Sequence, residues 1–141
     1  MEVLRVKILA PALALLLAFG PQIAPAQEVR QAEVPLDELV WVARPLVIFA
    51  TTENDPRFRR QMELLQTRPE ELALRDVQIF VDTDPDANGE MRRSLRPRGF
   101  MVVLIDKDGR VALRRPEPLR TDELVRFIDR TPLRQDEIRG N

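Results

Sequence analysis

The sequence contains no cysteine, no histidine and no tyrosine. The absence of cysteine excludes a disulfide framework, a cysteine nucleophile and thiol–disulfide exchange. Without histidine there is no imidazole base, so Ser94, the only serine, has no such group to activate it. A zinc site of the usual Cys/His type cannot be built either. Any catalysis by this chain therefore has to rely on carboxylates or on a bound metal ion.

The sequence also lacks an excess of charge of either sign, because it contains 22 Lys and Arg and 23 Asp and Glu. This balance gives no reason to expect nucleic acid or an anionic membrane as a partner. The length of 141 residues allows one small domain. Without disulfides, that domain has to be stabilised by a packed core.

The first 26 residues have the three parts of a secretory signal peptide. Arg5 and Lys7 give a positive start, an apolar run follows at 8–19, and Ala24-Pro25-Ala26 has the small-residue pattern of a cleavage site. A membrane span needs about 20 apolar residues, so an uncleaved anchor is the weaker alternative. We expect cleavage after Ala26 and a periplasmic or secreted protein without a stable membrane span.

Apolar runs bounded by turn residues predict four strands, at 46–50, 77–81, 100–105 and 110–114. Helical patterns open at Asp55-Pro56 and recur at 70–75, at 90–95 and from Thr121 to Pro132. The order β-α-β-α-β-β-α predicts a three-layer α/β sandwich with a mixed four-stranded sheet. Helical crossovers should make the first three strands parallel, and the Asp108-Gly109 hairpin adds an antiparallel fourth at an exposed edge.

The remaining segments are predicted to lie at the margins of a domain that spans 35–131. Residues 27–34 have the polar composition of a flexible leader, and residues 132–141 form a charged tail. Leu133 and Ile138 in this tail can dock on a partner, although such tails are more often solvated. We expect Trp41 to fill the edge of the core and the pre-proline residue Arg44 to be solvated.

Several stretches resemble a thioredoxin-fold protein. Residues 47–50 resemble the first core strand of that fold, which runs into a Cys-Gly-Pro-Cys loop. The aligned positions here are Glu53-Asn54-Asp55-Pro56. Phe100 or Met101 stands where the fold carries a cis-proline. The resemblance therefore implies the fold without its redox site.

A closer resemblance is to domain of unknown function 4174 (DUF4174), a small thioredoxin-like family found in exported bacterial proteins. It rests on LDELVWVARPLVIFATTENDPRF, GFMVVLIDKDGRVALR and LVRFIDRTPLRQDEIR, which together frame residues 36–139. The family implies a thioredoxin-like fold and an exported location. It implies no established activity and no cofactor.

The loop after the first core strand is the first candidate site, formed by Thr51, Thr52, Glu53, Asn54 and Asp55. Loops that follow buried strands in open α/β sheets favour binding sites, and the start of a helix attracts anions. Together with Phe100 and Met101 in the 96–101 segment, the loop can hold a peptide, a partner protein or a small anion. The alternative is ordinary helix capping by Asp55, because its carboxylate would use the same backbone amides.

The acidic loop Asp82-x-Asp84-x-Asp86 is the second candidate site. Oxygen ligands at alternate positions suit calcium, but Ala87 and Arg93 stand where an EF-hand needs glycine and glutamate. A solvated turn is the alternative.

We therefore expect a non-redox binding module whose partner is another periplasmic or envelope protein, with no cofactor other than calcium as a weak alternative. A carboxylate- or calcium-dependent enzyme, or a small-anion-binding protein, is the second hypothesis.

Overall fold

The computed structural model describes residues 27–140. The strands are β1 (Val29–Gln31), β2 (Arg44–Phe49), β3 (Val77–Asp82), β4 (Met101–Ile105) and β5 (Val111–Arg115). The helices are α1 (Pro56–Leu65), α2 (Pro69–Ala73), α3 (Glu90–Leu95), α4 (Thr121–Asp129) and α5 (Pro132–Gly140), and a 3-10 turn, η1 (Leu36–Leu39), precedes β2. Within residues 27–140, no helix combines the length and the apolar character that crossing a membrane requires. The predicted signal peptide lies outside the described residues.

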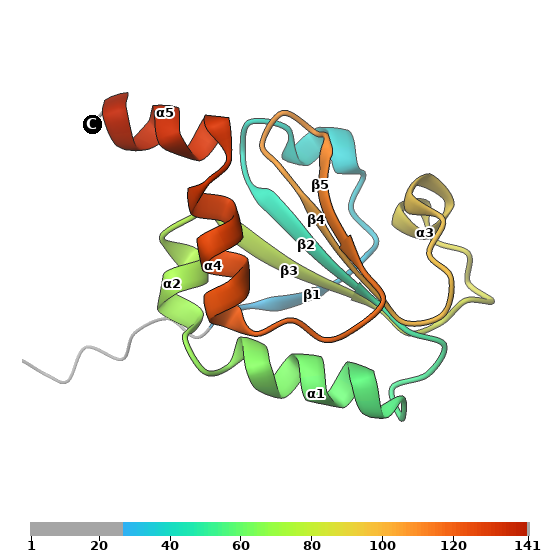
Figure 1. Cartoon of the computed structure of the whole chain (residues 1–141). Coiled ribbons are helices and arrows are strands. Elements are labelled where there is room, and N and C mark those ends of the chain that lie inside the picture. The colour runs from blue at the N-terminus through green and yellow to red at the C-terminus, as the bar shows by residue number, and fades with distance from the viewer. Residues whose placement is uncertain (1–26, 141) are drawn as a thin grey trace, which may run out of the picture.

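The strands form one mixed five-stranded sheet in the order β1-β3-β2-β4-β5 (Figure 1). β1 and β2 both run parallel to β3, and β4 runs antiparallel to β2 and to β5. The α/β fold predicted from the sequence is therefore confirmed, and so is the position of β5 at an edge of the sheet. The Asp106–Gly109 hairpin turn is confirmed as well, with Gly109 at a φ of 81°.

The direction predicted for β4 is wrong, because β4 is antiparallel to β2 and not parallel to it. The helix before it, α3, has six residues and does not carry the chain back across the sheet. Arg96 in the left-handed conformation ends α3, and Gly99 at a φ of 61° turns the chain again. β4 therefore begins with Met101 paired to Phe49, at the end of the sheet where β2 finishes.

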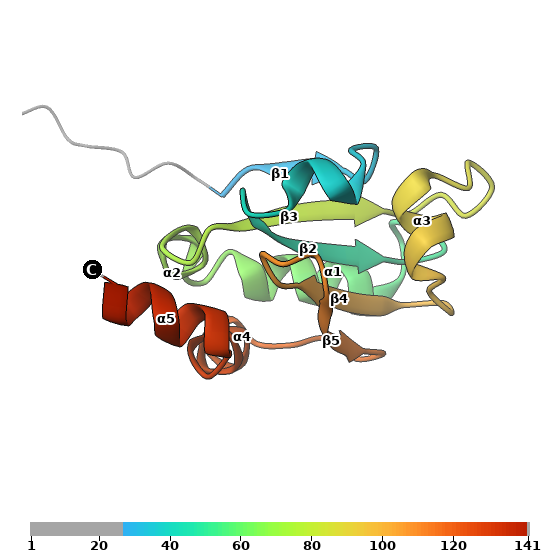
Figure 2. The same cartoon turned by 90° about the horizontal axis from the view of Figure 1, so that it is seen from above.

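Both faces of the sheet are covered by helices, as Figures 1 and 2 show. Leu46 and Ile48 of β2 pack into a core cluster with residues of α1, α2 and α4. Val47 and Phe49 point to the opposite face and pack with residues of α3 and η1. The continuous apolar run in β2 thus reflects burial on both faces of a three-layer structure.

The segment 27–34, predicted to be a flexible leader, contains the fifth strand, which the sequence analysis did not predict. β1 pairs with β3, and the amide of Ala32 donates to the carbonyl of Val81 at 3.0 Å. The apolar contact that holds this segment comes from Ala32, which is buried. A three-residue strand is too short to show an alternating pattern in the sequence.

Two further expectations are corrected at the opposite end of the sheet from the loop after β2. Trp41 does not fill the edge of the core, because it is 66% exposed and has a φ of 63°. The charged tail 132–141 is not an unstructured end, because residues 132–140 form α5. α4 ends before Pro132, as predicted. Pro132 is the first residue of α5, a position whose backbone N–H makes no hydrogen bond within the helix, so proline fits there.

Candidate functional site

The loop after β2 lies at the carboxyl ends of the two central parallel strands, where open α/β sheets usually bind their ligands. Thr51, Thr52, Glu53 and Asn54 are all exposed. Asp55 is buried and caps α1, since its Oδ1 accepts the amide of Arg57 at 2.8 Å. The predicted capping is therefore confirmed, and the amide of Arg57 is not free for an external anion.

The base of this loop is fixed by polar contacts. The amide of Asn54 donates to Thr52 Oγ1 at 3.3 Å, and Arg59 Nη2 donates to Asn54 Oδ1 at 2.7 Å. Arg57 donates from Nε and Nη2 to the two carboxylate oxygens of Asp55, at 3.2 and 2.9 Å. These side-chain hydrogen bonds are the main reason why the pKa of Asp55 is lowered.

Two side chains of the loop make no internal polar contact. Within residues 27–140, neither the hydroxyl of Thr51 nor the carboxylate of Glu53 has a hydrogen-bond or ion-pair partner, in contrast to the rest of the loop. Both side chains are exposed. The side chains of Thr51 and Glu53 are therefore the polar groups of the loop that another molecule can reach without breaking an internal contact.

Phe100 does not belong to an accessible site, although the sequence analysis placed it there. It is 1% exposed, packs in the core, and has the guanidinium of Arg57 at 5.4 Å from its ring centroid. Met101 is half-buried and pairs with Phe49 across the sheet. The 96–101 segment thus supplies a core residue, and a ligand at the loop cannot reach the ring of Phe100 without a rearrangement.

A nearly buried ion pair lies at the ends of the central strands β2 and β3, beside the loop, and the sequence analysis did not predict it. Arg92 of α3 donates from Nη2 and Nε to the two carboxylate oxygens of Asp82, at 2.8 and 2.9 Å. Its Nη2 also reaches the carbonyl of Ala50 at 3.1 Å, and the guanidinium lies 5.3 Å from the ring centroid of Phe49. The side chains of Arg92 and Asp82 are nearly buried. Arg92 therefore ties the ends of β2 and β3 together directly under the exposed loop.

The three carboxylates predicted as calcium ligands do not converge. Asp82 is paired with Arg92 and also accepts the amide of Asp84 at 3.1 Å. Asp84 Oδ1 accepts the amides of Asp86 and Ala87, at 3.2 and 3.4 Å, which is the local capping of a turn. Within residues 27–140, no group of three acidic side chains is placed to hold a metal ion. The geometry therefore favours the solvated turn over the calcium site.

The opposite end of the sheet holds a second buried arginine, Arg44, which was predicted to be solvated. Arg44 is fully buried at the start of β2. Its Nε donates to Asp106 Oδ1 at 2.9 Å, its Nη1 to the carbonyl of Arg75 at 2.9 Å, and its Nη2 to Glu137 Oε1 at 2.9 Å. The prediction failed because these partners lie 31 to 93 residues away in the sequence.

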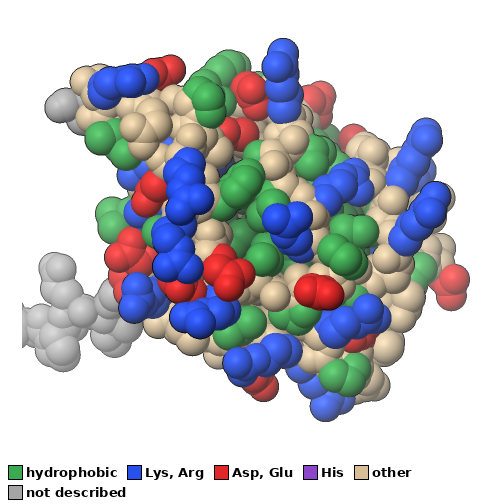
Figure 3. All heavy atoms as spheres, viewed as in Figure 1, with side chains coloured by type: hydrophobic (Ala, Val, Ile, Leu, Met, Phe, Trp, Pro, Cys, Tyr) green, Lys and Arg blue, Asp and Glu red, His purple; other side chains and the backbone are tan. Residues whose placement is uncertain are grey.

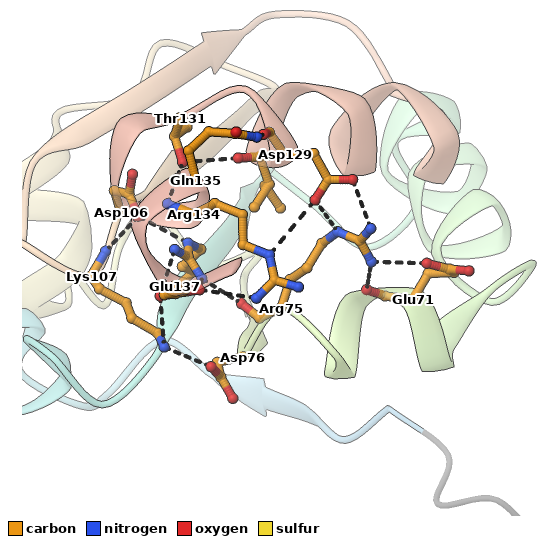
Figure 4. A network of polar contacts seen from close by, with 12 residues as sticks. Glu71, Arg75, Asp76, Asp106, Lys107, Asp129, Thr131, Arg134, Gln135 and Glu137 are labelled. Carbon is orange, nitrogen blue, oxygen red and sulfur yellow. Dashed lines mark hydrogen bonds and ion pairs between the residues drawn. The ribbon is translucent and has the colours of Figure 1, made fainter. Parts of the chain in front are cut away.

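Arg44 is the centre of a wider polar network, which Figure 4 shows converging from the β4–β5 turn, the end of α2 and α5. Lys107 pairs with Glu137 at 3.0 Å and with Asp76 at 2.6 Å. Burial opposes the ionisation of Glu137, but hydrogen bonds from the surrounding cations outweigh it and lower its pKa to about 2. α5 has no buried residue of its own, so this carboxylate is its main polar connection to the sheet.

The contacts of this network are those of a structural network that holds segments of the chain together. Arg75 extends it by pairing with Asp129 at 2.7 Å and with Glu71 at 2.8 Å. Each carboxylate named in it has a cationic partner within 3.0 Å. Each of these carboxylates is therefore committed to an ion pair, and the lowered pKa values of Asp129 and Glu137 keep those two groups ionised rather than ready to donate a proton.

Comparison with solved structures shows the fold. The chain is similar to the reduced 2-Cys peroxiredoxin of Plasmodium vivax, with a TM-score of 0.58 and 13% identity over 74% of this chain and 85% of that chain. It is also similar to thioredoxin peroxidase I of Plasmodium yoelii, with a TM-score of 0.55 and 17% identity over 77% of this chain and 82% of that chain. At these identities the similarity establishes a thioredoxin-like α/β fold and nothing of the activity.

Comparison at the level of sequence shows the family. No curated protein matches the chain. Residues 35–137 match a family described as domain of unknown function (DUF4174), and the match covers most of the chain, from η1 to α5. The chain thus belongs to the DUF4174 family, as a thioredoxin-like member that contains no cysteine.

Proposed function

We propose that this protein is an exported, non-redox binding module that docks a partner protein through the loop after β2. The observation that supports this most directly is the contrast within the loop. The loop is held by the Asp55 cap and by the Arg92–Asp82 pair, whereas the side chains of Thr51 and Glu53 are exposed and have no polar partner within residues 27–140. A loop that is already held in place and that presents unpaired polar side chains loses little conformational entropy when it docks.

The proposed location rests on the sequence of residues 1–26, which has the features of a signal peptide. The periplasm or the cell exterior is therefore the compartment in which we place the partner. The solved structures named above are called peroxiredoxins and thioredoxin peroxidase, but a thiol reaction cannot be transferred to a chain without cysteine.

The alternative functions from the sequence receive no comparable support. A calcium- or carboxylate-dependent enzyme needs convergent acidic side chains, and Asp82, Asp84 and Asp86 do not converge. A small anion at the loop would compete with Asp55 for the amide of Arg57 and would be repelled by Glu53.

The test is site-specific photo-crosslinking in cells that express the full precursor. A photoreactive residue at Glu53 is expected to give a discrete crosslinked product, and the same residue at Arg115, an exposed position on β5, is not. The captured protein, once purified, should bind the wild-type chain and an Arg115→Gln variant equally and should bind a Thr51→Asp/Glu53→Lys variant at least about tenfold more weakly. Equal binding by all three proteins would refute docking through this loop.

A further inference from the structure

A basic hollow lies on the helical face of the molecule, at a distance in the fold from the loop after β2. It lies between α1, the α1–α2 connection and the first turns of α4 and has a volume of about 580 Å³. Figure 3 shows several basic side chains, with some acidic ones between them, over the region where α1 and α4 approach each other in Figure 1. The hollow is lined by Arg60, Leu64, Thr67, Arg68, Arg120, Thr121, Asp122 and Arg126.

The lining is strongly unbalanced in charge, although the chain as a whole is nearly neutral. Four arginines from three segments face one carboxylate, that of Asp122. Asp122 accepts from Arg120 Nε and Nη2 at 2.9 and 3.2 Å, and from Arg126 Nη2 at 3.0 Å. A single carboxylate therefore serves two guanidinium groups, and the lining carries a net positive charge.

The positive charges of the other two arginines, Arg60 and Arg68, are balanced even less by nearby carboxylates. Arg60 has only an exposed helical pair with Glu63 at 3.1 Å, and such pairs contribute little. Arg68 has no ion pair or side-chain hydrogen bond within the described residues. Arg68 is therefore free to bind an anion that enters the hollow, and Arg60 has only this weak exposed pair to give up.

The floor of the hollow is polar and fixed. Thr121, which is almost fully buried, donates from its hydroxyl to the carbonyl of Leu64 at 2.7 Å. Thr67 donates to the same carbonyl at 2.7 Å, and the two hydroxyl oxygens lie 3.5 Å apart. The nine-residue helix α4 begins at Thr121, so the partial positive charge of its first turn adds to that of the arginines.

We propose that this hollow binds a ligand that carries a diphosphate or another closely spaced pair of phosphate groups. Guanidinium groups bind phosphate oxygens in a bidentate manner, and several of them around one concavity favour a multivalent anion. The volume lies within the range of small-ligand sites and exceeds what one phosphate needs. Asp122 occupies two of the arginines in the free protein and acts as an internal competitor. This site does not depend on the proposed role of the loop after β2.

The test is calorimetric titration of the full chain with inorganic pyrophosphate at low salt. An Arg68→Gln/Arg126→Gln variant should bind at least about tenfold more weakly, because two charge-assisted contacts are lost. An Arg98→Gln/Arg115→Gln variant removes the same charge from exposed positions elsewhere and should bind like the wild type. Equal losses in the two variants, or no binding by the wild type, would overturn the proposal.

A variant with the opposite expected sign makes the test sharper. Asp122→Asn removes the internal competitor without changing its shape and should tighten pyrophosphate binding by about threefold or more, with the gain reduced at high salt. Unchanged or weaker binding by Asp122→Asn would contradict the assignment of Asp122. Because a misfolded variant cannot bind more tightly, this result does not depend on the stability of the arginine variants.

The phosphate groups can belong to a soluble molecule or to a lipid headgroup, and sedimentation with vesicles separates these two sources. Vesicles of phosphatidylethanolamine that contain a prenyl diphosphate lipid serve as the probe, vesicles with phosphatidylglycerol in its place as the control for general negative charge, and pyrophosphate as the competitor. If the protein sediments with the vesicles, is released by pyrophosphate, and does not sediment when it carries Arg68→Gln/Arg126→Gln, the site binds a lipid headgroup. Pyrophosphate binding without sedimentation assigns it to a soluble ligand.

Discussion

Replacing Arg44, which is fully buried in β2, with methionine should destabilise the protein more than the replacement of any exposed arginine. Methionine keeps much of the length of the side chain but removes every donor. It leaves Asp106 and Glu137 without their buried cation and leaves the carbonyl of Arg75 without a donor. Breaking a buried ion pair by removing one partner lowers the free energy of unfolding by about 3–5 kcal/mol. That is a large part of the about 5–15 kcal/mol that stabilises a typical domain.

Urea denaturation measures this loss, and an Arg115→Met variant is the control. Arg115 is exposed on the edge strand β5, so its replacement should change the free energy of unfolding by no more than about 0.5 kcal/mol. A double-mutant cycle of Arg44→Met with Glu137→Gln should give a coupling energy of at least about 1 kcal/mol, because the two side chains share hydrogen bonds. A loss below about 1 kcal/mol for Arg44→Met would refute the view that this network fixes the end of the sheet.

The same network makes stability depend on pH in the acid range. The pKa of Glu137 is about 2 in the folded protein, against 4.5 for the unperturbed group. Between these two values the unfolded state binds more protons, so the free energy of unfolding should decrease as the pH falls from about 4.5 towards 2. At 1.36 kcal/mol per pKa unit the contribution is about 3 kcal/mol at most. Glu137→Gln should lack this part of the acid dependence, and an unchanged acid slope in the variant would contradict the assignment.

Three further predictions concern other parts of the fold. Arg92→Met should lower the free energy of unfolding by about 2–4 kcal/mol, measured in urea, because Asp82 and the carbonyl of Ala50 lose a nearly buried partner. A loss as small as that of Arg115→Met would contradict the view that Arg92 holds the ends of β2 and β3 together. Gly109→Ala should cost about 1–2 kcal/mol in the same assay, since Gly109 has a φ of 81° and an added Cβ would lie 3.1 Å from Val40 Cγ2. Millimolar calcium should leave the melting temperature unchanged. A saturable increase in melting temperature would instead support a calcium site at the acidic loop 82–86.

Local sequence patterns predicted those elements whose causes are local. The run at 46–50 is apolar on both faces because β2 is buried on both faces. Asp55-Pro56 was recognised as a helix start because the cap and the first helical position are adjacent in the chain. The turn before β5 was recognised because Gly109 supplies the positive φ that it requires.

The errors arose where the cause lies far away in the chain or in the length of an element. The sequence pattern predicts the wrong direction for β4 because α3, with six residues, is too short to return the chain across the sheet. The burial of Arg44 depends on Glu137, 93 residues away, and that of Arg92 depends on the packing of α3 against the sheet. A single sequence shows these residues only as isolated charges, and charges are usually exposed.

The two buried arginines fix the two ends of the central strand β2. Arg44 joins β2 to the segments before β3 and after β4 at one end of the sheet, and Arg92 joins β2 to β3 at the other. Buried ion pairs contribute less to net stability than their number of hydrogen bonds suggests, but each fixes the geometry of the groups that it connects. At the end held by Arg92, the loop after β2 is exposed beside this fixed ion pair, from Thr51 to Asn54. The basic hollow between α1 and α4 contains neither arginine, so a variant of one region leaves the other intact, and the two proposals can be tested independently.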